Sequence, residues 1–100
     1  MIAKVAEFRN KDDAAEYHIV GKDTHDDFDE ILDFLVRLEG VSVTDRLDGI
    51  YSRTASLRRG ATDFKLVFHE DVGNYLICDS SRPEGQAEVL HMARRMTGTE

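Results

Sequence analysis

The spacing of apolar residues is helical in residues 24–39. Apolar side chains recur there at steps of three and four residues, which is the period of one face of an α-helix. Thr24 followed three residues later by Asp27 predicts a capping-box start, and Gly40 predicts the end of the helix. The face expected to point inward is formed by Phe28, Ile31, Leu32, Leu35 and Leu38.

A second helix is predicted over residues 82–96. Ser81 with Glu84 three residues later suits its first turn, and Pro83 falls where a missing N–H has no consequence. Arg94 and Arg95 in the last turn complement the negative end of the helix dipole. The inner stripe is expected to contain Val89, Met92, Ala93 and Met96, with Leu90 at its edge.

Between the two helices the hydrophobic period changes from 3.6 to 2, which is typical of strands. Connections as short as those around Gly49, Gly60 and Gly73 join antiparallel neighbours, and we expect a positive φ at these glycines. Parity puts Val43 and Leu47 on one face. The strands of this meander are predicted over residues 41–47, 51–58, 63–69 and 74–79.

Near the N-terminus, residues 2–8 and 16–20 have strand character and predict a hairpin. The element order is then ββαββββα in a single domain over residues 1–100. Two separate helices can cover one face of an antiparallel sheet, which defines an α+β two-layer sandwich. In the strand at 51–58, apolar residues alternate with polar ones such as Thr54 and Ser56. We therefore expect the sheet face that carries the polar residues, opposite the helices, to be exposed to solvent.

Composition narrows the classes of function. The formal net charge is −7, and residues 1–50 carry all of the excess with 13 acidic against 6 basic side chains. Such a charge disfavours nucleic acid or an anionic membrane as a partner. A membrane span needs about 20 consecutive apolar residues, which the sequence lacks.

The single cysteine, Cys78, lies in a predicted apolar strand, so we expect it in the core. The N-terminal residues do not have the pattern of a secretory signal, and we therefore expect a cytoplasmic location.

The most conspicuous candidate surface is an acidic stripe on the first helix. Its carboxylates follow one another at i, i+3, i+4 and i+7, which aligns them on one exposed side. Carboxylates in a first turn are favoured by the helix dipole, so a solvated face is one interpretation. The other is a docking surface for a basic protein, as in an inhibitor or immunity-type module. The stripe comprises Asp26, Asp29, Glu30 and Asp33.

Arg53 and Arg58 are expected to form a second contact on the polar face of their strand. The same arginines suit a homodimer in which they meet the acidic stripe of another copy.

No catalytic motif is present, so the sequence favours a non-enzymatic protein without a cofactor. The spacing of its His, Cys, Asp and Glu residues does not match a known metal motif. The alternative that stays open is a small-ligand or metal-dependent activity in a pocket near His69, Glu70 and Tyr75, where a hairpin end could gather donors.

Overall fold

Six antiparallel strands and two helices follow one another in the predicted order, ββαββββα. The computed structural model describes residues 4–11, 14–78 and 83–98. Its elements are β1 (Lys4–Arg9), β2 (Ala15–Val20), α1 (His25–Leu38), β3 (Ser42–Asp48), β4 (Ser52–Arg59), β5 (Thr62–His69), β6 (Gly73–Cys78) and α2 (Pro83–Thr97). The predicted α+β class is therefore confirmed.

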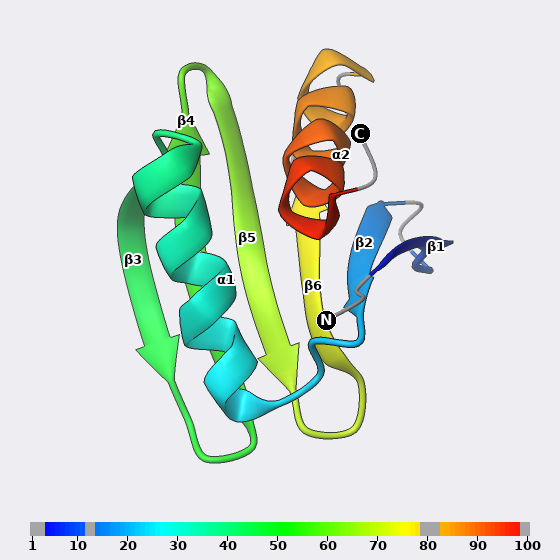
Figure 1. Cartoon of the computed structure of the whole chain (residues 1–100), viewed down its shortest axis with the longest axis vertical. Coiled ribbons are helices and arrows are strands. Elements are labelled where there is room, and N and C mark those ends of the chain that lie inside the picture. The colour runs from blue at the N-terminus through cyan, green and yellow to red at the C-terminus, as the bar shows by residue number, and fades with distance from the viewer. Residues whose placement is uncertain (1–3, 12–13, 79–82, 99–100) are drawn as a thin grey trace.

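All six strands form one sheet in the order β1-β2-β6-β5-β4-β3. The four strands from β3 to β6 make the expected meander, and the N-terminal hairpin joins it through β2 and β6. That junction is short, because it runs only from the pair Glu16 and Ile77 to the pair His18 and Tyr75. Figure 1 shows β2 beside β6, with β1 outermost at this edge.

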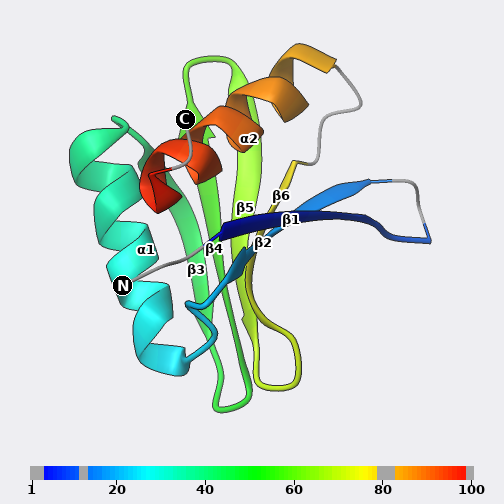
Figure 2. The same ribbon diagram turned by 45° about the vertical axis from the view of Figure 1, so that its right-hand side comes forward.

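Both helices lie on the same face of the sheet (Figure 2). Burial alternates along β5, where Phe64, Leu66 and Phe68 are buried beneath the helices and Lys65 and Val67 lie on the opposite face. This alternation is the two-residue period of a sheet that is covered on one side. The face opposite the helices is therefore open among the described residues, as the sequence predicted.

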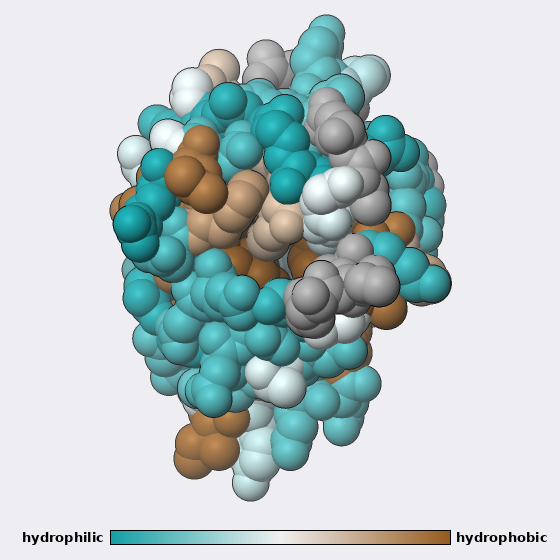
Figure 3. Space-filling model, in the orientation of Figure 1, coloured by the Kyte–Doolittle hydropathy of each residue, from teal (hydrophilic) through white to brown (hydrophobic). Residues whose placement is uncertain are grey.

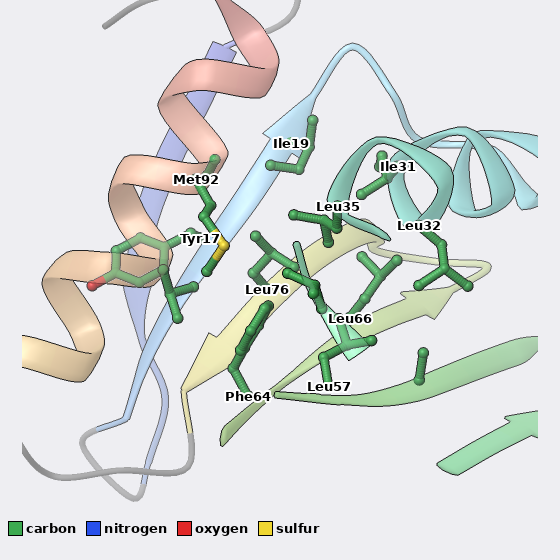
Figure 4. Packing of buried hydrophobic residues seen from close by; sticks show 14 of the residues in the cluster. Tyr17, Ile19, Ile31, Leu32, Leu35, Leu57, Phe64, Leu66, Leu76 and Met92 are labelled. Carbon is green, nitrogen blue, oxygen red and sulfur yellow. The ribbon is translucent and has the colours of Figure 1, made fainter. Parts of the chain in front are cut away.

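The core is a single cluster between the helices and the sheet (Figure 4). Phe28 and Leu35 from α1 and Met92 from α2 are fully buried against Leu66 and Leu76 of the sheet. Full burial of such a side chain contributes about 1.5–3 kcal/mol relative to leaving it exposed. Of the predicted inner stripe of α2, Val89, Met92 and Ala93 are buried and Met96 is partly buried, and Cys78 is buried as expected.

The start of α1 follows the sequence prediction closely. Thr24 is the N-cap, and its Oγ1 accepts a hydrogen bond of 3.2 Å from the backbone N–H of Asp27. The backbone N–H of Thr24 in turn donates to Asp27 Oδ2 at 3.1 Å, which completes the capping box. Gly40 has a φ of 68° just beyond the helix, the left-handed conformation predicted there. The capping role predicted for Ser81 lies outside the described residues.

Three local expectations were wrong. A β-bulge between Val43 and Asp45 shifts the register of β3, so Val43 and Leu47 fall on opposite faces. Leu38 is 71 % exposed because it ends α1 at the rim of a groove between the helices rather than over the sheet. Gly49 does not have a positive φ; instead, a Cβ there would lie only 3.0 Å from the Ser52 carbonyl oxygen.

Candidate docking surface at the loop end

The structure places the four carboxylates of the predicted acidic stripe on α1, and three of them have a cation within the chain. Lys22 Nζ donates to both carboxylate oxygens of Glu30 at 2.7 Å. Arg37 pairs with Asp33 at 3.3 Å one turn away on the same helix. Asp29 is engaged by Arg53 through two hydrogen bonds, of 2.9 and 3.0 Å. Asp26 alone has no ion pair among the described residues.

Arg53 does not lie on the polar sheet face as expected. Its side chain is only 6 % exposed and points toward α1. Its parity along β4 is that of Ala55 and Leu57, which both belong to the core, and the strand period therefore carries it to the helix side. The guanidinium carbon lies 4.3 Å from the centroid of the Phe28 ring, a cation–π contact.

The Arg53 guanidinium joins three segments of the chain. Besides Asp29, it donates to Asp48 Oδ1 at 3.1 Å and to the backbone carbonyl of His25 at 3.2 Å. These bonds fix the first turn of α1 to the end of β3 and to β4. The hydrogen bonds from Arg53 lower the pKa values of Asp29 and Asp48. This arrangement, which we call the Arg53 cluster, is structural because its charges satisfy one another.

Arg58 does lie on the open sheet face, and it too has a carboxylate partner within the chain. Its Nε donates to Asp63 Oδ1 at 2.8 Å, across the hairpin that joins β4 to β5. Hydrogen bonding with Asp63 raises the pKa of Arg58. Both arginines named from the sequence therefore already have carboxylate partners that a second copy would have to displace.

Of the residues of the alternative site, His69 shares with Val67 the open sheet face on which Tyr75 lies, and Glu70 belongs to the turn that follows β5. Tyr75 lies in the open sheet face, where its ring stacks on His18 with centroids 4.7 Å apart, and burial raises its pKa. His69 ends β5 and Glu70 follows it; both are exposed, and His69 Nδ1 accepts a hydrogen bond from the backbone N–H of Asp71 at 3.2 Å. In the part of the chain that the structure describes, no group of three His, Cys, Asp or Glu residues could hold a metal ion.

A different group of residues comes together where two hairpin loops and the start of α1 meet, at the bottom of Figure 1. The backbone N–H of Glu70 donates to the Tyr51 carbonyl at 2.8 Å, which joins the β3–β4 loop to the β5–β6 loop. We call this surface the loop end. It comprises Asp23, Asp26, Ile50, Tyr51, Glu70, Asp71 and Val72.

The start of α1 is attached to the loop end by β6. The side chain of Asn74 is buried, and its Nδ2 donates to the carbonyls of Lys22 and Thr24 at 2.8 and 3.0 Å. Asp23 packs against Gly73, where a Cβ would lie 2.9 Å from the Asp23 carboxylate. Gly73 also has a φ of 97°, so both space and conformation require glycine there. These contacts hold the loop end in a fixed arrangement.

The loop end combines exposed apolar side chains with carboxylates that form no ion pair in the described part of the chain. Ile50 is 82 % exposed, Tyr51 63 % and Val72 51 %. None of the carboxylates of Asp23, Asp26, Glu70 and Asp71 forms an ion pair with any described residue. Apolar anchors surrounded by polar residues are the usual composition of a protein interface.

Sequence reasoning found part of this surface. Asp26 belonged to the predicted stripe, and Glu70 to the alternative pocket. Ile50 and Val72 were overlooked because they occupy turns between strands, where patterning says nothing about burial. An apolar residue beside the turn glycines Gly49 and Gly73 was the signal that could have indicated them, since turns are ordinarily polar.

Among the described residues, neither helix has the length and apolar character needed to cross a membrane.

Comparison with known proteins gave no match: neither a family model, nor a curated protein, nor a solved structure matches the chain.

Proposed function

We propose that the protein is a non-enzymatic interaction module that docks a basic protein partner through its loop end. The observation that supports this proposal is the juxtaposition of three exposed apolar side chains, Ile50, Tyr51 and Val72, with four carboxylates that have no cation among the described residues. Elsewhere in the acidic half of the chain, carboxylates such as Glu30 and Asp29 are already paired.

The two kinds of side chain have different roles in docking. Tyrosine and large aliphatic residues act as anchors, and a few such residues carry most of the binding energy of an interface. Carboxylates at the rim accelerate encounter with a cationic surface and select against acidic partners, and this effect weakens as salt is added. A rigid frame adds affinity because little conformational entropy is lost on binding. The hydrogen bond between the loops and the bonds from Asn74 provide that frame.

This proposal keeps the class of function expected from the sequence and changes the surface. The class is an inhibitor or immunity-type module. Its acidic surface carries negative charge as a row of phosphates does, and therefore attracts a basic protein. Of the predicted stripe, only Asp26 remains in the surface. Cys78 is a buried thiol that is not in a disulfide, which fits a reducing compartment such as the cytoplasm.

The test is a pull-down from source-cell lysate at low and high salt, with captured proteins identified by mass spectrometry and their affinities measured with purified material. The docking variant replaces Ile50→Ser and Tyr51→Ser together, and the charge variant replaces Asp26→Lys and Glu70→Lys. The matched control is Asp33→Lys, which changes a carboxylate of the same helix outside the loop end.

We expect a basic protein that wild type and the Asp33→Lys variant retain, that high salt releases, and that both loop-end variants fail to hold. Circular dichroism establishes that each variant is folded. Retention of the same partner by both loop-end variants would overturn the proposal, as would a partner that only the Asp33→Lys variant loses.

A further inference from the structure

A hollow of about 500 Å³ lies where the loop end meets the open face of the sheet. It is bounded by side chains of β1 and β2 on one side and by the β5–β6 turn on the other. Phe8, Val20 and Val72 give it apolar walls, and Glu16, Asp23 and Asp71 contribute carboxylates. We call this hollow the wedge.

The wedge follows from the way the sheet bends. Pairing between β2 and β6 stops at His18 and Tyr75, although β2 continues to Val20. In Figure 2 the β1–β2 hairpin runs at a steep angle to β4 and β5. The end of β2 and the β5–β6 turn therefore diverge, and the space between them is not filled by backbone pairing.

Ring contacts fix one wall of the wedge. Phe8 meets His18 edge to face with centroids 4.9 Å apart, and His18 stacks on Tyr75. The His18 imidazole is also held by a hydrogen bond of 3.0 Å between its Nε2 and Glu16 Oε1. Phe8 is nevertheless 56 % exposed, so its ring remains available for contact with a ligand.

Carboxylates outnumber possible cations around the wedge. Among the described residues its lining contains neither lysine nor arginine, His18 lies against Glu16, and the carboxylates of Asp23 and Asp71 have no ion pair with a described residue. The apolar groove of about 340 Å³ between α1 and α2, visible in Figure 3, gives the contrast. There the rim carboxylates Glu30 and Asp33 already pair with Lys22 and Arg37 of the same rim, so that groove has no charge left to complement.

We propose that the wedge receives a lysine or arginine side chain of the basic partner. The aliphatic stem of such a side chain packs on Phe8, Val20 and Val72, and its charged head reaches the carboxylates of Asp23 and Asp71. Long basic side chains commonly bury the stem and keep the head in a polar setting, and an aromatic ring adds attraction for the cation. That this side chain belongs to a basic protein partner rests on the proposed function. That the wedge suits a lysine or arginine side chain does not.

The apolar walls favour an organic cation over a metal ion. A divalent metal requires several oxygen or nitrogen ligands at fixed distances and gains nothing from Phe8 or Val72. The described residues also hold no cluster of three or more candidate metal ligands. The wedge instead combines apolar side chains and carboxylates in one lining, which suits a cation with an aliphatic stem.

The probe is N-acetyl-lysine methylamide, with its arginine counterpart, titrated into the ¹⁵N-labelled full chain and followed by NMR. N-acetyl-norleucine methylamide is the matched neutral control, because it has a similar stem without the ammonium. We expect saturable shifts at the amides of Phe8, His18 and Val72 with the basic probes, and binding at least tenfold weaker for norleucine.

Two variants locate the contact. Asp23→Asn with Asp71→Asn removes both charges at constant size, and we expect it to weaken lysine binding at least tenfold. Phe8→Ala should weaken binding of both basic probes severalfold, and Asp33→Asn on the far side of α1 should leave it unchanged. Overlay of the spectra outside the wedge shows that each variant keeps its fold.

Absence of saturable shifts at the wedge up to the solubility limit of the probes would overturn the inference. So would equal binding of norleucine, or binding that the double asparagine variant leaves intact. The result is separate from the pull-down. Lysine binding in the wedge without a basic protein at the loop end would refute the proposed function alone, and the reverse result would refute the wedge alone.

Discussion

The Arg53 cluster and the loop end lie at the same end of the protein and are both acidic, yet they differ in how their charges are satisfied. In the cluster, Asp29 and Asp48 share a guanidinium that is 6 % exposed. At the loop end, Asp23, Asp26, Glu70 and Asp71 have no ion pair among the described residues, and apolar side chains lie exposed beside them. The difference teaches that carboxylates only one helical turn apart, such as Asp26 and Asp29, can be exposed without an ion pair to a described residue in one case and paired within the chain in another.

Replacing Arg53 is the strongest way to break the cluster. In Arg53→Leu the two carboxylates lose their shared cation, and we expect stability to fall by about 2–3 kcal/mol. Removing one partner of a fully buried ion pair costs about 3–5 kcal/mol. We expect a smaller loss of stability here because both carboxylates are half-exposed. Urea unfolding followed by circular dichroism measures the change. Arg53→Lys should recover part of the loss, and a variant as stable as wild type would show that the cluster is not structural.

Acid titration tests a second internally paired carboxylate, at the other end of α1. Glu39 is buried and receives hydrogen bonds from Arg95 at 2.9 and 2.6 Å, which lower its pKa below the ordinary value of 4.5. The stabilisation is therefore fully present above that value and is lost as the pH falls through the lowered pKa. We expect Glu39→Gln to cost about 1–2 kcal/mol at neutral pH.

The measurement is the midpoint of urea unfolding as a function of pH. The variant should lose less stability than wild type on acidification, so the gap between them should narrow at low pH. A difference in stability between wild type and variant that stays constant as the pH falls into the acid range would contradict the assigned role of Glu39.

A matched pair on the first turns of α1 sharpens the comparison. Asp29→Asn weakens the bonds to Arg53, and we expect a loss of about 1 kcal/mol because Asp29 remains half-exposed. Asp26→Asn removes only a favourable interaction with the helix dipole, about 0.5 kcal/mol or less. Thermal unfolding of the two variants side by side gives the difference. Equal losses would mean that the pairing of Asp29 adds nothing to stability.

The loop end should show the smallest effect on stability. Ile50→Ser and Tyr51→Ser remove exposed side chains, and surface substitutions of this kind usually stay within about 0.5 kcal/mol. Urea unfolding provides the measurement, and the proposed function predicts that the same substitutions abolish partner binding in the pull-down. A large loss of stability would show that Ile50 and Tyr51 are structural and would remove the basis for a docking role.

Arg53 shows how far the sequence could be taken. Its parity matches Ala55 and Leu57, so strand periodicity alone was sufficient to place it beneath the helices. The expectation that it joins Arg58 on the polar face went against that parity and was wrong. That Asp29 and Asp48 would meet it there could not be predicted, since these residues are 24 and 5 positions away along the chain.

The sequence by itself determined the elements and their order, because helix and strand periods, caps and turn glycines act over a few residues. It also determined which face of β5 and of α2 is buried, since a local period fixes the side-chain direction. Tertiary structure decided that β2 joins β6, which carboxylates acquire a cation, and that two loops and a helix start form one surface. These outcomes depend on contacts between residues far apart in the chain, which no local pattern specifies.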